Sequence, residues 1–306
     1  MSARARPGPP GRVRRPSDWL ELVRAPAALT VLGDAVAGAA AAGRPLRGRR
    51  LVLPLASATL YWSGMALNDW ADREVDRAER PERPVPSGRI TPGAALAGAA
   101  LLSGAGLALA AFAGGSDALR VAVPLTAAIW AYDTVLKPTR AAPLGMAACR
   151  ALDVLLGAGA GRGLSARTPA LAMAAHTFGV TVLSRGEVHG GRRADVRVAL
   201  TTTLLSAALA CGGRASSARH RTASVLCALV HTGTTATAQL AAARARPSAD
   251  GPVEAAAVRT ATVAGIHGMV PLQAALAARS GSLGAAALVL GVLPLVRRLS
   301  SVRSPT

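Results

Sequence analysis

Apolar residues in this chain are gathered into long blocks that short polar or charged connections separate. The blocks show neither the three-to-four-residue stripe of a surface helix nor the alternation of a half-buried strand. Several reach the roughly 20 residues that an α-helix needs to cross a bilayer. They are rich in Ala and Gly, and such small residues let helices pack closely in lipid. The pattern predicts an all-α, polytopic transmembrane helical bundle of about nine or ten spans.

The predicted bundle occupies residues 19–298 as one integral domain. Residues 1–18 are basic and rich in Pro and Gly, so we expect a disordered arm there, and residues 299–306 are expected to form a C-terminal tail. One weaker block could be a re-entrant or interfacial piece, which leaves nine and ten spans both open. The candidate spans are 19–42, 51–70, 91–113, 117–136, 141–160, 168–185, 194–211, 221–243, 254–278 and 282–298.

The charges in the connections predict an orientation, because cytoplasmic connections are enriched in Lys and Arg. With the N-terminus inside, the basic connections 71–90, 137–140 and 186–193 and the C-terminal tail all face the cytoplasm. Two basic connections, 43–50 and 212–220, disagree with this orientation. We therefore predict a multi-pass protein of a bacterial plasma membrane, with its N-terminus and its charged loops in the cytoplasm.

The net charge of +19 does not point to nucleic acid. The arginines lie between apolar blocks instead of forming one patch, and aromatic residues make up only 3% of the chain, too few for a base-stacking platform. Lys137 is the only lysine, a bias that a GC-rich genome would produce. The three cysteines show no metal-ligand spacing and imply no disulfide framework.

The most acidic stretch runs from Asn68 to Arg89, between two apolar blocks. Asn68, Asp72 and Asp76 recur every four residues, so on a continuous helix they stay near one face. A row of such oxygens suits Mg2+, which takes one or two carboxylates from a protein and phosphate oxygens for the rest. The stretch also contains guanidinium groups that match phosphate geometry, at Arg73, Arg77, Arg80, Arg83 and Arg89. The alternative is a solvated loop whose mixed charges neutralise each other.

Two motifs in this stretch resemble those of a known family. NDWADREVD resembles the NDxxDxxxD motif of the UbiA superfamily of intramembrane prenyltransferases, and RPERPVPSGRI is similar to the segment that follows it. The resemblance covers residues 19–298. It implies a helical bundle that moves an isoprenoid from its diphosphate onto an aromatic or other small acceptor with Mg2+. It also implies that Asn68 and Asp72, supported by Asp76, hold Mg2+ on the diphosphate.

A second acidic cluster is expected at the end of the sixth span, where this chain reads LSRGEVHGGRRADVR. Only Glu187 and the distant Asp195 are acidic there, so the chain resembles a divergent member with a weakened second motif. Glu187 could hold a second Mg2+ with help from His189. Alternatively, three arginines could neutralise the diphosphate without a metal, namely Arg185, Arg192 and Arg193. The loop could also be non-catalytic.

Further polar residues lie at the ends of other spans. Tyr132, Asp133 and Lys137 follow the fourth span, and the resemblance implies a phosphate contact from Tyr132 and Lys137. The alternative for Lys137 is an anchor that reaches the membrane surface. Arg24 could bind an anionic acceptor or serve as an interfacial anchor. Trp70 could flank an allylic cation.

Ionisable residues inside a membrane usually face a cavity or each other. Arg150 and Asp153 lie in the fifth span and are spaced so that they can pair. The resemblance implies that Asp153 lines an acceptor pocket, and a purely structural pair is the alternative. Asp34 appears isolated in the first span. The histidines at 176, 231 and 267 are expected to pack or to form hydrogen bonds.

These interpretations combine into one hypothesis, a Mg2+-dependent integral membrane prenyltransferase. Its partners are a polyprenyl diphosphate, an unknown acceptor and the lipid bilayer. We expect catalytic roles for Asp72, Asp76, Lys137 and Glu187, and metal binding by Asn68, Asp72, Asp76 and Glu187. Substrate binding is expected from Arg24, Asp69, Arg73, Arg83, Arg89, Tyr132, Arg150, Asp153, Arg185 and His189. The alternatives are a non-catalytic relative that binds or moves a lipid or pigment precursor, and a transporter of another class.

Overall fold

The structure is a computed structural model that describes residues 15–213, 215–245 and 253–302. Within these ranges, the only strand-like pairing is an isolated antiparallel bridge between Gly191 and Val253. The predicted all-α fold is therefore confirmed. The α-helices are α1 (Pro16–Leu22), α2 (Leu32–Ala41), α3 (Leu53–Ala71), α4 (Arg73–Glu79), α5 (Pro92–Ala131), α6 (Ala142–Ala158), α7 (Arg167–Ser184), α8 (Arg193–Cys211), α9 (Ala218–Arg244), α10 (Ala255–Arg279) and α11 (Leu283–Val302). Shorter helical segments are η1 (Ala25–Thr30), η2 (Gly48–Val52), η3 (Tyr132–Leu136) and η4 (Ala160–Ala166).

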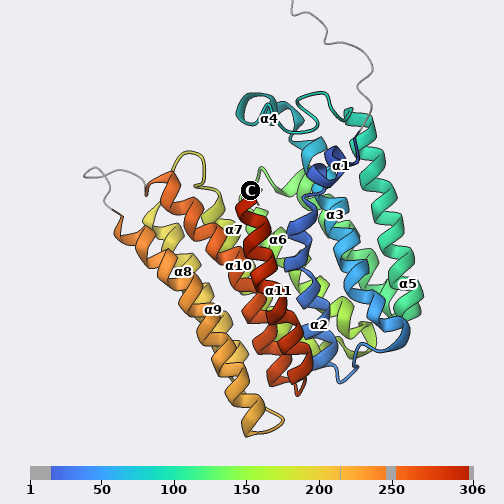
Figure 1. Cartoon of the computed structure of the whole chain (residues 1–306), viewed down its shortest axis with the longest axis vertical. Coiled ribbons are helices and arrows are strands. Elements are labelled where there is room, and N and C mark those ends of the chain that lie inside the picture. Colours follow the sequence, from blue (N-terminus) through green and yellow to red (C-terminus); the bar gives the residue numbers. More distant parts are fainter. Residues whose placement is uncertain (1–14, 214, 246–252, 303–306) are drawn as a thin grey trace, which may run out of the picture.

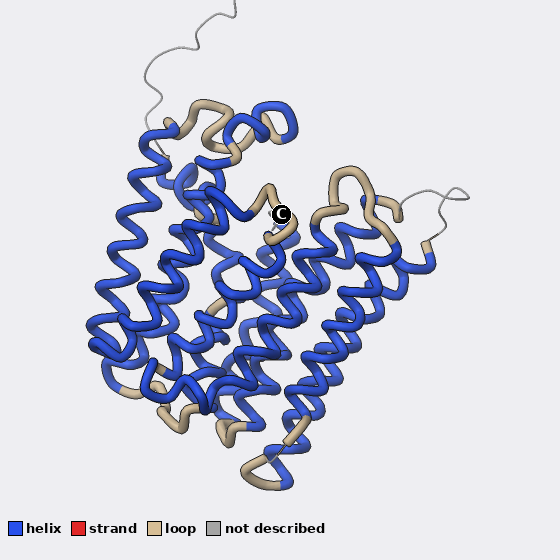
Figure 2. Tube along the Cα trace, turned by 180° about the vertical axis from the view of Figure 1, so that it is seen from behind, coloured by secondary structure: helices blue, strands red, loops and turns tan. Residues whose placement is uncertain are grey.

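The long helices lie side by side, and α4 with the loop after it stands beyond one end of the bundle (Figure 1). Most connecting loops lie at the two ends (Figure 2). The most extensive packing joins α3 to α5, α7 to α8 and α9 to α10. Alanine supplies much of the core, so the helices approach one another closely.

Helices α2 and α6 approach each other closely through a reciprocal pair of glycines. A Cβ added to Gly157 would meet the backbone carbonyl of Ala35, and one added to Gly38 would meet the carbonyl of Val154. Larger residues at these positions would push the two helices apart. This contact matters for the site because α6 carries Arg150 and Asp153.

Helix α5 contains two of the predicted spans. Gly115 has non-helical backbone angles, with φ of 64° and ψ of −151°. The halves on either side fold back on each other, so that the Trp130 indole N–H of the second half donates to the Ser103 hydroxyl of the first at 3.0 Å. Glycine suits this turn since it adopts a positive φ without a steric cost.

The first predicted span, 19–42, is not one helix. Helix α1 ends at Leu22, the chain turns at Arg24, and η1 leads into α2. Arg24 has a φ of 44° and is the only non-glycine residue with a positive φ in the described ranges. A side-chain-bearing residue in this conformation costs about 1–3 kcal/mol and often marks a functional position.

The number of spans stays a prediction. By length and composition, four described helical segments could each cross a membrane, or five if the bent α6 and η4–α7 pair forms one span. That pair is bent by 114°, and the segment Pro92–Leu136 is counted once there although it reverses at Gly115.

The predicted chain ends differ in part from the structure. Residues 1–14 of the expected arm lie outside the described residues, and the helix Pro16–Leu22 begins before the predicted domain boundary at residue 19, which stays a prediction. Helix α11 continues to Val302 and includes the start of the expected tail.

The basic connection 43–50, which disagreed with the predicted orientation, has a structural use. Arg44 Nη1 donates to the carbonyl oxygen of Ala158 at 3.2 Å, and Arg50 Nη2 donates to that of Gly157 at 2.9 Å. These carbonyls end α6, where helix geometry leaves them without partners and concentrates negative partial charge. Arg44 also pairs with Asp117 at 2.5 Å. The two arginines therefore cap a helix, whichever side of the membrane they occupy.

Candidate active site

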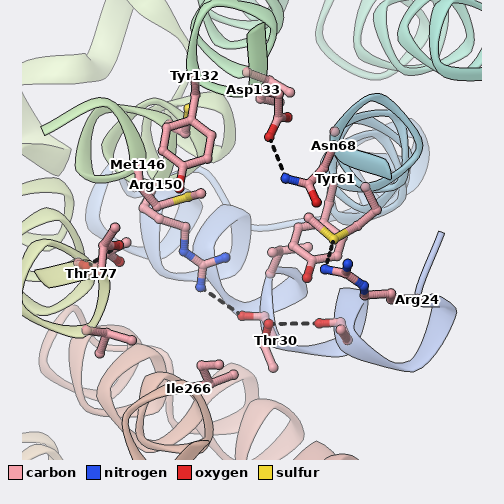
Figure 3. A pocket seen from close by; sticks show the side chains of 18 of the residues that line it. Arg24, Thr30, Tyr61, Asn68, Tyr132, Asp133, Met146, Arg150, Thr177 and Ile266 are labelled. Carbon is pink, nitrogen blue, oxygen red and sulfur yellow. Dashed lines mark hydrogen bonds between the residues drawn. The ribbon is translucent and has the colours of Figure 1, made fainter. Parts of the chain in front are cut away.

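A cavity of about 360 Å³ lies between the N-terminal and C-terminal helices of the bundle (Figure 3). Its outer part is polar, and its middle is lined by aliphatic and methionine side chains from α3, α5, α6, α7 and α10. The predicted site residues that line it are Arg24, Asn68, Arg83, Tyr132, Lys137, Arg150, Asp153 and Glu187. The structure thus brings together residues separated by more than 160 positions in the sequence.

Asn68 lies near the end of α3, where the helix delivers it to the cavity. Its side-chain amide donates to Asp133 Oδ1 at 3.2 Å, and both residues are buried. Figure 3 shows the pair facing each other across the gap between α3 and η3. One N–H of the Asn68 amide is used in this bond, and its side-chain oxygen has no hydrogen bond among the described residues.

Asp72 lies at the break between α3 and α4, yet helical hydrogen bonding continues across the break. The Asp72 amide donates to the Asn68 carbonyl at 2.9 Å, and the Asp76 amide donates to the Asp72 carbonyl at 2.8 Å. The side chain of Asp72 forms an ion pair with Lys137. Lys137 lines the cavity, whereas Asp72 is not among the lining residues and lies behind Lys137 through this ion pair.

The other two aspartates of the motif hold arginines. Asp76 is 2% exposed and accepts from Arg83 Nη1 at 2.6 Å. Asp69, also 2% exposed, pairs with Arg24 at 3.2 Å and with Arg83 at 3.7 Å. Neither aspartate lines the cavity, whereas both arginines do. The carboxylates of Asp69 and Asp76 thus hold guanidinium groups, and the metal-binding and catalytic roles expected of Asp76 stay predictions.

The loop after α7 places Glu187 at the cavity. Glu187 is 8% exposed, and its Oε1 atom has no hydrogen-bond partner among the described residues. Burial raises the pKa of its carboxyl group, opposed by a hydrogen bond from Thr262 and by the positive charges of Arg80 and Arg259. Glu187 therefore brings a buried carboxylate group, one oxygen of which has no partner among the described residues, to the lining of the cavity.

The glycines of this loop are required by its packing. Gly191 and Val253 exchange two backbone hydrogen bonds of 3.0 and 2.7 Å. A Cβ at Gly186 would collide with the backbone of Gly191. Side chains with carboxylates at these positions would disrupt the loop, which explains why only Glu187 carries an acid into the cavity.

Three residues that were expected to bind substrate do not line the cavity, namely Arg73, Arg185 and His189. Arg185 and His189 are exposed. Arg73 donates to the Trp70 carbonyl at 2.8 Å and stacks over the Trp70 ring, 5.0 Å from its centroid. The indole of Trp70, at the end of α3, is thus in contact with the guanidinium group of Arg73, at the start of α4.

Arg89 was expected to bind substrate, but it joins α1 to the loop after α4. Arg89 pairs with Glu21 through two hydrogen bonds of 2.6 and 2.8 Å and with Asp18 at 2.9 Å. The hydrogen bond to Glu21 raises the pKa of Arg89 above its usual value. These contacts connect the segment that carries Arg24 to the loop that carries Arg83.

Replacing Arg89 by glutamate should loosen both segments and lower kcat/KM of any reaction at this cavity about 10- to 100-fold through misplaced arginines. The double exchange of Arg89→Glu with Glu21→Arg should recover part of that loss, because the pair is restored with reversed polarity although the new carboxylate at position 89 faces Asp18. Steady-state kinetics of both variants would measure this. An Arg89 that contacts the diphosphate directly would not be rescued by the exchange.

The inner end of the cavity contains a buried polar network. Arg150 pairs with Asp34 at 3.0 Å, so the expectation that Asp34 is isolated was wrong. Asp153 also interacts electrostatically with Arg150, as its spacing on the helix allowed. Its carboxylate accepts from the Ser57 hydroxyl at 2.7 Å. Gln273 donates to Asp34 Oδ1 at 2.8 Å.

Sequence reasoning missed two residues of the site and the signals were weak. Arg80 lines the cavity; it was counted among the guanidinium groups that match phosphate geometry but was left out of the expected substrate ligands. Asp133 was noted beside Tyr132 without a role, and its contact with Asn68 spans 65 positions. The histidines at 176 and 231 behave as expected, since each bonds a backbone carbonyl of α10 at 2.8 Å.

A model of the UbiA prenyltransferase family matches residues 29–243. The digeranylgeranylglyceryl phosphate synthase of Methanoculleus marisnigri is 31% identical over 178 residues, which cover 55% of this chain and 63% of the relative. That of Methanopyrus kandleri is 41% identical over 75 residues, 24% of this chain and 27% of the relative. The matched stretches thus span between about a quarter and less than two thirds of these relatives.

Solved structures share the fold. A UbiA homologue from Aeropyrum pernix K1 superposes with a TM-score of 0.61 at 16% identity and covers 89% of this chain and 98% of its own. A UbiA homologue from Archaeoglobus fulgidus bound to GPP and Mg2+ gives a TM-score of 0.58 at 14% identity, covering 85% and 99%. At these identities the likeness concerns the fold alone.

The fold and the site define a class of multi-pass helical membrane protein, one whose apolar cavity is capped at one end by oxygen ligands and guanidinium groups. The family model matches most of the chain. The protein belongs to the UbiA prenyltransferase family, as the sequence motifs indicated.

Proposed function

We propose that this protein transfers an isoprenoid from its diphosphate to a small acceptor, with Mg2+ bound at the diphosphate. The observation that carries the proposal is the polarity of one cavity. Its outer end gathers Asn68, Lys137 and Glu187 with the guanidinium groups of Arg80 and Arg83. Its middle is apolar, as an isoprenoid tail requires.

The donor set fits one Mg2+ ion bound together with a diphosphate. Among the described residues, no group of three or more His, Cys, Asp or Glu is gathered to hold a metal. Mg2+ needs no such group, because it takes few protein carboxylates and completes its shell with phosphate oxygens and water. Asn68, Asp72 and the unpartnered Oε1 of Glu187 would hold it. When bound, Mg2+ withdraws electron density from the diphosphate and stabilises it as a leaving group.

The residues of the chain would support ionisation of the donor. The bond between the allylic carbon and the diphosphate oxygen breaks, and its electron pair leaves with the diphosphate. Lys137, Arg80 and Arg83 stabilise that developing charge through charge-assisted hydrogen bonds. The acceptor then forms a bond to the allylic carbon and loses a proton, while the surrounding helices limit competing attack by water.

The location is part of the proposal. We infer a bacterial plasma membrane with the polar end of the cavity facing the cytoplasm, where soluble diphosphates are available. The support is the basic character of the connections at that end, 71–90, 137–140 and 186–193. Labelling of single cysteines introduced into these loops, in intact cells and in inverted vesicles, would test the orientation.

Purified full-length protein in lipid nanodiscs should release diphosphate from GPP when Mg2+ and a suitable acceptor are present. Chelation of Mg2+ with EDTA should abolish release, and added Mg2+ should restore it. Quantification of prenylated product and of diphosphate would measure the reaction. Binding of GPP without turnover, across a broad acceptor panel, would favour the non-catalytic lipid-binding alternative, and an absence of GPP binding would reject both.

A further inference from the structure

Two polar contacts join the end of α3 to the segment η3 in a regular arrangement. The Asn68 amide donates to Asp133 Oδ1 at 3.2 Å, and Lys137 pairs with Asp72. Each contact joins positions that are 65 residues apart. Asp72 follows Asn68 by four residues, and the same step separates the two partners in and just after η3. The contacts therefore lie about one helical turn apart and connect one face of each segment.

The backbone on both sides allows Asp133 to reach α3. Segment η3 is a π-helical turn, in which the Lys137 amide donates to the Tyr132 carbonyl at 2.9 Å, five residues back. Such turns are rare and often occur at functional sites. On the facing helix, a Cβ added to Gly64 would lie 3.6 Å from Asp133 Oδ2. The glycine therefore leaves room for the carboxylate of Asp133 beside α3.

Asp133 is a buried carboxylate that the reaction as described does not use. It is 6% exposed and belongs to the lining of the cavity. Among the described residues, its side chain accepts one hydrogen bond, from Asn68. The positive charge of Lys137 acts on it, but that ammonium group is already paired with Asp72. Burial of a carboxylate is costly, so its contact with Asn68 is the feature that calls for an explanation.

The contact decides which side of the Asn68 amide a cation would meet. An asparagine side chain can present either its oxygen or its NH2 group, because the torsion of the amide is broad and roughly two-fold. An ionised carboxylate only accepts hydrogen bonds, so Asp133 keeps the NH2 group on its own side. Figure 3 shows the Asn68 nitrogen turned toward Asp133 and the oxygen turned away from it. Without Asp133, the NH2 group could replace the oxygen at the metal.

We propose that Asp133 is a positioning residue of the Mg2+ site, which orients the Asn68 amide so that its oxygen is available to the metal. The inference rests on the proposed function, in which Asn68 is a ligand of Mg2+. Asp133 acts through Asn68 and is not itself a ligand. Groups that orient a metal ligand through a hydrogen bond typically contribute about 10- to 100-fold to metal affinity.

The test is a double-mutant cycle on Mg2+ affinity. Mg2+ is titrated calorimetrically into the full chain in nanodiscs with the unreactive donor geranyl S-thiolodiphosphate bound. Asp133→Leu keeps the approximate size of the side chain but removes the acceptor, and it should weaken Mg2+ binding about tenfold or more. Asn68→Ala should weaken it as well. Adding Asp133→Leu to Asn68→Ala should weaken it by at most about threefold further, whereas independent effects would multiply. The affinity for the donor analogue without Mg2+ should not fall in Asp133→Leu.

Thr134→Val is the matched control, because Thr134 is the next residue of η3, is exposed and donates to the Trp130 carbonyl at 2.7 Å, outside the cavity lining. It should leave Mg2+ affinity unchanged. Unchanged affinity in Asp133→Leu, or an equal loss in Thr134→Val, would overturn the inference. A full second loss in the Asn68→Ala background would also overturn it, because Asp133 would then act on the metal directly. If the unmodified chain with donor analogue bound no Mg2+, the proposed function itself would fail.

Discussion

Replacing Asp72 by alanine should lower kcat/KM for prenyl transfer by about 10³-fold or more. Two losses combine in this variant. The carboxylate expected to bind Mg2+ disappears, and Lys137 loses the ion-pair partner that holds its ammonium group at the polar end of the cavity. Product formation from GPP at saturating Mg2+ would measure the effect, and calorimetric titration of Mg2+ with a prenyl diphosphate analogue would separate metal binding from chemistry.

Glu74→Ala provides the matched control, because Glu74 lies two positions further along the same acidic stretch. Its side chain is 63% exposed, pairs with Arg77 and does not line the cavity. It should keep activity within about a factor of two of the unmodified protein, as surface substitutions usually do. Equal losses in both variants would mean that general acidity of the stretch matters and that Asp72 has no specific role. Full activity of Asp72→Ala would remove the proposed site.

The local sequence pattern was sufficient to predict the helices and the polar residues at the outer end of the cavity. The block of apolar residues ending at Asn68 predicts a helix that delivers the motif to a membrane surface, and α3 does so. A single lysine in an arginine-rich chain singled out Lys137, which the structure places beside Asp72. Both inferences depend on residues within one or two helical turns, where spacing determines direction.

The inner half of the site could not be predicted because its partners are distant in sequence. Arg150 and Asp153 satisfy the spacing for a pair on one helix, but Asp34 reaches Arg150 from α2. Packing of α2 against α6 through Gly38 and Gly157 makes this approach possible. A spacing rule describes one helix alone, so it cannot anticipate a competitor on a neighbouring helix.

Distant partners also explain why the contacts of individual arginines could not be predicted from the sequence. Arg89 matched a family motif and was interpreted as a substrate ligand, yet its guanidinium group is taken by Glu21, 68 positions earlier. Arg44 lies in a connection that disagrees with the predicted orientation, and in the structure its guanidinium group contacts the carbonyl end of α6. A guanidinium group serves a phosphate, a carboxylate or a helix terminus equally well, and only the fold determines which one it meets.

The ion pair of Asp34 and Arg150 leads to the second large effect, one on stability. Asp34→Ala should cost about 3–5 kcal/mol of folding free energy, since it leaves a buried guanidinium charge without its partner. Arg150→Met should cost less, because an unpaired aspartic acid can take up a proton whereas arginine cannot release one. Loss of folded protein and thermal unfolding in detergent would rank the variants.

The double variant decides whether the pair, and not the packing of either side chain, sets this cost. Asp34 is fully buried and Arg150 is 7% exposed, so both sites can hold apolar side chains of similar size. Asp34→Leu combined with Arg150→Met should recover most of the stability lost in Asp34→Ala, because the guanidinium charge is removed and the remaining carboxyl group of Asp153 can take up a proton. If the double variant were no more stable than Asp34→Ala, the loss would come from the cavity left behind, and Asp34 would act through its volume and its hydrogen bond with Gln273.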